Sequence, residues 1–84
     1  MKLLNVGFEN FVSEERVVSV LGTDSAPIKR LIRLAKESGN LIDASCGRKT
    51  QSVIIMNSDH VVLSALTAEN LVNKISRSDI ELTF

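Results

Sequence analysis

The fold is decided by the stretch SVIIMNSDHVVLSA, residues 52–65, the most apolar part of the chain. Two apolar, largely β-branched runs flank a polar break at Asn57-Ser58-Asp59, which are residues that favour turns. The pattern predicts a hairpin with strands over residues 52–56 and 60–65. A strand with one face in water alternates apolar and polar side chains, and these runs do not. Both faces of the hairpin are therefore expected to be covered.

Strands are also predicted on the N-terminal side of this hairpin. Residues 2–8 have the composition of a short strand, with Gly7 allowing a turn or bulge at its end. Residues 16–21 form a β-branched run that predicts a second strand. A third, brief strand is expected over Leu41-Ile42-Asp43, leading into a turn at Gly47.

Two helices are predicted from their capping residues. Ser25 can cap the first, Pro27 is tolerated in its first turn, and Gly39 ends it at about Ser38. Thr67 can cap the second, which frays near residues 76–78. The predicted order is ββαβββα, an α+β domain with a small, mostly antiparallel sheet and two helices.

The two helices leave a choice about how the sheet is covered. They could lie on opposite faces, or both could pack on one face and leave the other to a neighbouring subunit. We favour the second arrangement, since many chains of this size gain stability by association.

Composition indicates one folded domain. The chain has 84 residues, of which 44% are hydrophobic and 24% charged, enough apolar side chains for a compact core. Neither a signal-peptide core nor a membrane span is predicted. A single cysteine, Cys46, excludes an internal disulfide and is typical of a reducing cytoplasm. Residues 79–84 alternate apolar and polar side chains, and are expected to be an edge strand or a loose tail.

The formal net charge is zero, but the charges are not evenly distributed along the chain. Residues 16–58 contain seven cations and three acids, a net charge of +4, while each flank carries −2. This basic centre is the feature that favours a polyanionic partner.

Two groups of cations are candidates for phosphate binding. Lys29, Arg33 and Lys36 form one stripe on the first helix, with Arg30 about a quarter-turn away. This stripe is either a solvated outer face or a phosphate-binding surface. Arg48 and Lys49 follow Gly47 in a turn, and Thr50, Gln51 and Ser52 add neutral donors. That turn is either a charged solvent loop or a contact for phosphates and base edges.

Other chemistries have weaker signals. Cys46 and His60, with Asp43 or Asp59, are the ingredients of a thiol nucleophile and its base, but no local signature accompanies them. No metal-ligand spacing or phosphate-binding glycine loop is present in the sequence. Only three aromatic residues occur, which disfavours single-stranded nucleic acid, and Phe8 and Phe11 are assigned to the core or an interface. We therefore expect a protein that is not an enzyme and needs no cofactor or metal.

Several segments resemble a known family. They are, in order, Asn5-Val6-Gly7-Phe8-x-Asn10, Ser25-Ala26-Pro27-Ile28-Lys29-Arg30, Leu41-Ile42-Asp43-Ala44, Gly47-Arg48 and Val53-Ile54-Ile55-Met56. These motifs are similar to those of the RemA family, small bacterial regulators of extracellular-matrix genes. The resemblance covers about residues 2–75 and implies a RemA-like domain over residues 1–78, followed by a tail at 79–84.

The resemblance implies a cytoplasmic, nucleoid-associated transcriptional regulator of matrix and biofilm genes. Its fold would resemble LytTR-type DNA-binding domains, and its partners would be duplex DNA and further copies of itself in a ring-shaped homo-oligomer. No membrane or small-molecule substrate is expected. The expected DNA contacts are Arg16, Arg48, Lys49, Gln51, Lys29, Arg30 and Arg33.

Two of these positions depart from the family pattern. Lys49 replaces the second arginine of a usual pair, and Gln51 stands where the family often has another arginine. For Arg16, an ion pair within or between subunits is the alternative to a DNA contact. For the whole protein, the alternative is a non-enzymatic, oligomeric scaffold or adaptor that binds an acidic protein.

Overall fold

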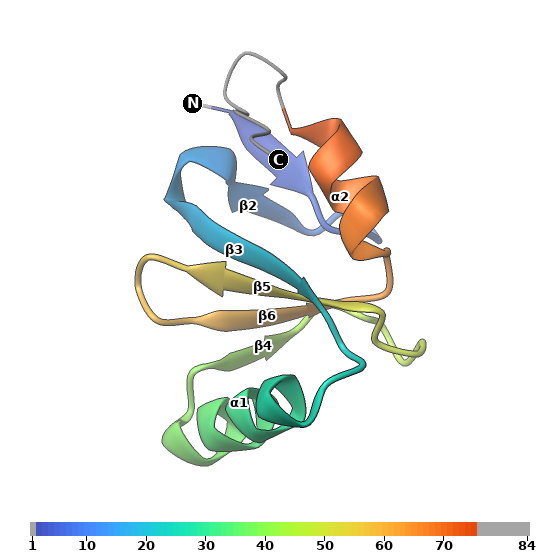
Figure 1. The fold of residues 1–84 in the computed structure, drawn as a ribbon. Coiled ribbons are helices and arrows are strands. Elements are labelled where there is room, and N and C mark those ends of the chain that lie inside the picture. Colours follow the sequence, from blue (N-terminus) through green and yellow to red (C-terminus); the bar gives the residue numbers. More distant parts are fainter. Residues whose placement is uncertain (1, 76–84) are drawn as a thin grey trace, which may run out of the picture.

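The predicted hairpin lies at the centre of a four-stranded sheet. The computed structural model describes residues 2–75. Strands β5 (Ser52–Met56) and β6 (Val61–Ser64) pair antiparallel, and β3 (Val17–Gly22) pairs antiparallel with β5 (Figure 1). Strand β4 (Leu41–Asp43) lies on the other side of β6 and runs parallel to it. The order β3-β5-β6-β4 confirms the α+β class and the mostly antiparallel sheet.

The N-terminal region differs from its prediction. The first strand, β1 (Leu3–Asn5), ends before Gly7 and pairs with an additional strand, β2 (Phe11–Ser13), in a separate two-stranded sheet. The expected strand over 2–8 is shorter because Gly7, Phe8 and Glu9 all have positive φ, which turns the chain back on itself. A 3₁₀ turn, Glu14–Arg16, then leads into β3, so Arg16 precedes that strand.

Both helices form where their capping residues predict. Helix α1 (Ala26–Ser38) begins at Ser25, whose Oγ accepts from the Ile28 amide at 3.4 Å, and it ends at Gly39 with φ +80°. Helix α2 (Ala68–Lys74) begins at Thr67, whose Oγ1 accepts from the Asn70 amide at 3.1 Å. The predicted fraying at 76–78 and the tail at 79–84 lie outside the described residues.

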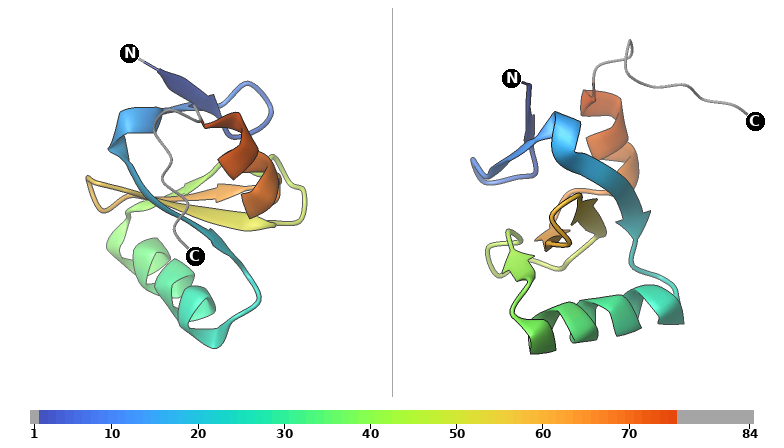
Figure 2. Two further views of the ribbon diagram at one scale, coloured as in Figure 1. Left: turned by 45° about the horizontal axis from the view of Figure 1, so that its top comes forward. Right: turned by 90° about the vertical axis from the view of Figure 1, so that its left-hand side faces the viewer.

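Each face of the four-stranded sheet is covered by this chain. Helix α1 lies on one face, while α2 and the β1–β2 sheet lie on the other (Figure 2). The α1 side has Val53, Val61 and Leu63 among its buried residues. The opposite side has Ile54 and Val62, packed with residues of β1 and α2. The arrangement with both helices on one face is therefore wrong, because the unpredicted β1–β2 sheet joins α2 on the second face.

No helix within residues 2–75 is long and apolar enough to cross a membrane.

Candidate functional site

The cation pair lies in a crossover loop, residues 44–51, between β4 and β5. These strands are not neighbours, since β6 lies between them, so the loop passes across the C-terminal end of β6. The Ala44 amide donates to the Leu63 carbonyl at 2.9 Å, and the Gln51 amide donates to the Ser64 carbonyl at 2.8 Å. The loop therefore lies at the opposite end of β5 from the hairpin turn, and both of its ends are anchored to β6.

The loop backbone is fixed by a tight turn just before Arg48. The Arg48 amide donates to the Ser45 carbonyl at 3.0 Å, and the two residues between them, Cys46 and Gly47, have φ of +52° and +77°. Asp43 Oδ1 accepts from the Ser45 hydroxyl at 2.5 Å and from the Ser45 amide at 2.9 Å. These two hydrogen bonds hold the Asp43 carboxylate against the loop.

The same hydrogen bonds lower the pKa of Asp43 below its usual value, with the Ser45 side chain making the larger contribution. A carboxylate whose folded pKa is lowered stabilises the fold above its unfolded pKa. That contribution is present at neutral pH and is lost as the pH falls through the folded pKa.

A second tight turn lies beside the first. The Asn10 amide donates to the Gly7 carbonyl at 3.0 Å, and the intervening Phe8 and Glu9 have φ of +54° and +63°. Asn10 Nδ2 lies 4.0 Å from Cys46 Sγ, which places the two turns side by side. The β1–β2 turn is thereby brought to the loop that carries the cation pair.

Two buried hydroxyls hold this end of the fold together. Ser52 and Ser64 are paired across β5 and β6, and neither is exposed. Ser64 Oγ donates to the Val6 carbonyl at 2.7 Å, and Ser52 Oγ donates to the Leu66 carbonyl at 2.7 Å. This end of the central strands is thus connected directly to the segment that precedes Phe8.

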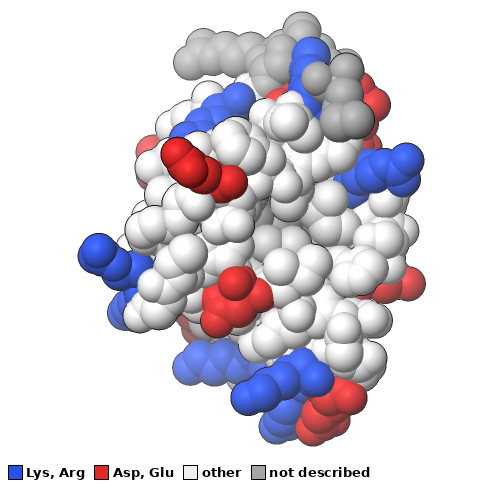
Figure 3. Space-filling view, turned by 180° about the vertical axis from the view of Figure 1, so that it is seen from behind, with Lys and Arg blue, Asp and Glu red and all other residues white. Residues whose placement is uncertain are grey.

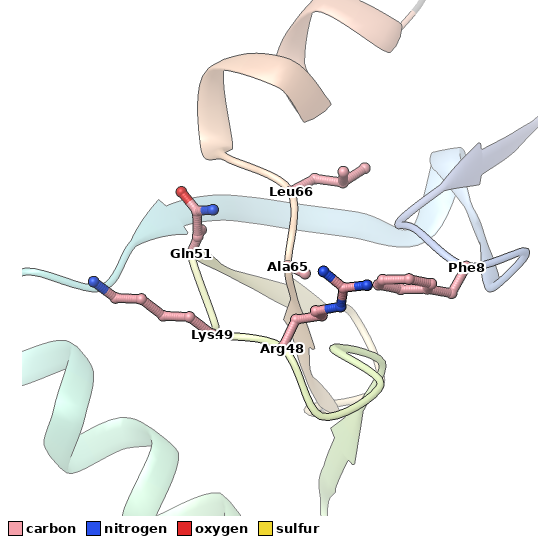
Figure 4. A pocket seen from close by; sticks show the side chains of 6 residues that line it. All are labelled: Phe8, Arg48, Lys49, Gln51, Ala65 and Leu66. Atoms are coloured by element: carbon pink, nitrogen blue, oxygen red, sulfur yellow. The ribbon is translucent and has the colours of Figure 1, made fainter.

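Arg48 and Lys49 point in different directions from this loop (Figure 4). The Arg48 side chain is directed at Phe8, with Cζ 5.9 Å from the ring centroid, while Lys49 extends away from both. A surface pocket of about 340 Å³ lies here. It is lined by Phe8, Arg48, Lys49, Gln51, Ala65 and Leu66. The site therefore combines two separated cations and an amide with an aromatic ring and an apolar floor.

The structure brings Arg48, Lys49 and Gln51 together, and separates them from the other predicted residues. Arg16 is exposed at the opposite end of the sheet, where its carbonyl accepts from the Asn57 amide at 2.8 Å. Lys29, Arg30 and Arg33 are exposed on α1. The basic centre of the sequence is thus divided among three parts of the surface. On the face in Figure 3, Lys and Arg lie around the rim, while Asp and Glu lie both along the rim and nearer the middle.

The thiol and imidazole expected for an enzyme do not meet in this chain. Cys46 is exposed in the crossover loop, whereas His60 lies at the far end of the hairpin. His60 Nδ1 is 2.7 Å from Ser58 Oγ, so the imidazole contacts the hairpin turn. No cluster of three potential metal ligands occurs within residues 2–75.

Phe8 was missed as a site residue by sequence reasoning. Phe8 is 51% exposed and Phe11 is 54% exposed, so neither belongs to the core of this chain. The sequence does carry one signal, because Gly7 and Asn10 are residues that favour turns and they bracket Phe8.

Replacing Glu9 by glycine is expected to stabilise the fold. A left-handed conformation costs an L-residue about 1–2 kcal/mol and costs glycine almost nothing. Part of that gain is offset by the greater entropy of glycine in the unfolded chain, which leaves about 0.5–1 kcal/mol. Thermal denaturation of Glu9→Gly checks this. The control is Glu37→Gly in α1, which should lose about 1 kcal/mol; equal losses in both variants would contradict the strain at Glu9.

Comparison with known proteins places this arrangement in context. The model of the RemA-like family, described as extracellular matrix regulatory protein A-like, matches residues 3–75. A "Putative regulatory protein" of Geobacillus kaustophilus strain HTA426 is 51% identical over 79 residues, which cover 94% of this chain and 91% of that protein. One of Acetivibrio thermocellus is 47% identical over 81 residues, which cover 96% of this chain and 87% of that one.

A third relative, from Clostridium acetobutylicum, carries the same name and is 49% identical over 79 residues, with 94% and 86% of the two chains covered. The family match spans nearly every described residue, including both tight turns and the crossover loop. The chain therefore belongs to the RemA-like family, and its relatives are named as regulatory proteins.

Proposed function

We propose that this protein is a transcriptional regulator of extracellular-matrix and biofilm genes that binds duplex DNA as a ring-shaped homo-oligomer. The observation that carries the proposal is the exposed cation pair, Arg48 and Lys49, on a loop whose backbone is anchored at both ends. Arginine and lysine with a neighbouring amide suit phosphates and base edges. Family membership supports the regulatory role. The protein would act in the cytoplasm, associated with the nucleoid.

Assembly would make this small site effective. One chain has no net charge, and its cations are divided among separate surfaces. Repeating a weak site on a ring raises avidity without new contacts. Arg16 and the cation pair lie at opposite ends of the sheet, so a head-to-tail assembly can present both at regular intervals.

The covered sheet cannot drive this assembly, because its two faces are packed within the chain. Exposed apolar side chains offer an alternative basis. Among the described residues these are Leu3, Phe8, Phe11, Val18, Leu34 and Ile42, each about half exposed or more. Val18 and Ile42 lie on the two edge strands of the four-stranded sheet, which are the elements open to a neighbour.

Sedimentation with and without duplex DNA tests the proposal. We expect a closed oligomer well above a dimer at micromolar concentration. Adding duplex DNA should produce a faster-sedimenting complex, and the affinity of that complex should fall as the salt concentration rises. Arg16→Ala should weaken DNA binding without changing the size of the oligomer. A stable monomer would contradict the ring. An oligomer that does not bind duplex DNA would favour the alternative of a scaffold that binds an acidic protein. If Arg16→Ala changes the size of the oligomer but leaves DNA binding intact, Arg16 is an assembly residue.

A further inference from the structure

Arg48 is the only described cation that lies against an aromatic ring. Its Cζ is 5.9 Å from the centroid of Phe8, within the range of a cation–π interaction. Figure 4 shows the guanidinium group directed at the ring, with Lys49 extending the other way. The two cations of the pair therefore differ in their surroundings: Arg48 lies beside an aromatic ring and Lys49 does not.

Phe8 is held in this place by an unfavourable backbone. Positive φ at Phe8 and Glu9, closed by the Asn10 to Gly7 hydrogen bond, is the pattern of a type I′ turn. Such turns strongly favour Asn and Gly, and a bulky residue at positive φ is an outlier. Two further hydrogen bonds enforce the turn: the Gly7 amide donates to Asn5 Oδ1 at 2.8 Å, and Asn10 Nδ2 donates to the Gly7 carbonyl at 3.0 Å.

Burial does not compensate for this strain. Phe8 stays 51% exposed and borders the surface pocket instead of entering either core cluster. Strained residues of this kind persist where the surrounding structure enforces them, and they cluster at functional sites. The Arg48 guanidinium is directed at this ring, and both residues line that pocket.

We propose that Phe8 is a positioning residue that holds the Arg48 guanidinium ready to bind DNA. The inference rests on the proposed function, since it assigns a role within the same site. A guanidinium held beside a ring keeps the N–H groups that point away from the ring free to donate to a phosphate or a guanine. Holding the side chain before binding removes part of the entropy that ordering it would cost.

A double-mutant cycle tests this role. Phe8→Leu keeps an apolar side chain and the same turn but removes the ring face. It should weaken duplex binding about two- to five-fold per engaged contact, the size expected for a solvent-exposed cation–π pair. In an Arg48→Ala background the same change should have almost no effect. In a Lys49→Ala background, the matched control, Phe8→Leu should have its full effect. Phe8→Trp, which keeps an aromatic ring at this position, should bind duplex DNA as the unmodified protein does.

The cycle also separates positioning from direct contact. If Phe8→Leu weakens binding equally in the Arg48→Ala background, the ring itself touches DNA and the positioning role is overturned. If Phe8→Leu changes the size of the oligomer by sedimentation, Phe8 belongs to an assembly interface, which also overturns it.

A readout without DNA keeps the two proposals distinguishable. The ring current of Phe8 should shift the Arg48 Nε–H resonance, and Phe8→Leu should remove that shift. An identical resonance in both proteins overturns the contact, whatever the DNA result. If the unmodified protein shows the shift but binds no duplex DNA, the proposed function is overturned, and with it the role of the Phe8–Arg48 contact in DNA binding.

Discussion

Arg48→Ala is expected to weaken duplex binding more than any other single substitution on this surface. Arg48 is exposed, its backbone is fixed by the turn from Ser45, and its guanidinium lies 5.9 Å from the centroid of the Phe8 ring. An arginine ordered in this way can donate two parallel hydrogen bonds. The expected loss is about 1–3 kcal/mol per engaged contact. Filter binding at several salt concentrations measures it.

Lys49 should contribute differently. It extends away from Phe8 and carries a point charge on a flexible stem. Each phosphate neutralised steepens the dependence of log affinity on log salt by about 0.9. Lys49→Ala should therefore weaken binding to all sequences about equally and flatten that slope by roughly one contact per engaged subunit. Lys49→Arg, which restores the usual family pair, should tighten binding.

The controls for these variants lie on α1. Lys29→Ala and Arg33→Ala remove the same charge from an exposed surface on another part of the fold. Binding and salt slope should change less in these variants than in the loop variants, while sedimentation shows equal assembly in all. If both loop variants keep the wild-type slope and an α1 variant flattens it, the DNA surface lies on α1.

Local signals predicted the central hairpin and the helix boundaries. Ser25, Gly39 and Thr67 act through hydrogen bonds and φ values within one turn, so their positions can be read directly. The β1–β2 hairpin has a weaker signal: Gly7 and Asn10 favour a turn, but Phe8 and Glu9 occupy the positions where a type I′ turn favours Asn and Gly. Tertiary hydrogen bonds, such as Ser64 Oγ to the Val6 carbonyl, help to fix this segment.

The cations of the candidate site were predicted from the sequence, but their surroundings were not. The sequence marks Arg48 and Lys49 because they are adjacent cations after a turn residue. It could not show that the loop crosses over β6, since that follows from the pairing of β4 with β6. The contact between Phe8 and Arg48 depends on that crossover, which brings two segments distant in sequence to the same end of the sheet.

Ile54→Ala and Leu63→Ala should each lower the free energy of unfolding by about 2–5 kcal/mol. Ile54 is 0% exposed on the face covered by α2 and β1, and Leu63 is 8% exposed on the face covered by α1. Removing either side chain leaves a cavity beneath a cover that belongs to the same chain. For a domain of this size, each change should lower Tm by roughly 10 °C or more.

Dilution distinguishes this result from the arrangement with one open face. If a neighbouring subunit covered one face, the loss at that face would depend on protein concentration, because unfolding would be coupled to dissociation. Intrachain packing on both sides predicts two losses that stay constant from high to low concentration. Val18→Ala is the control: at 63% exposure on the edge strand β3, it should cost little in a monomer. A loss at Val18 that changes with concentration, beside constant losses at Ile54 and Leu63, would place the subunit contact on the sheet edge.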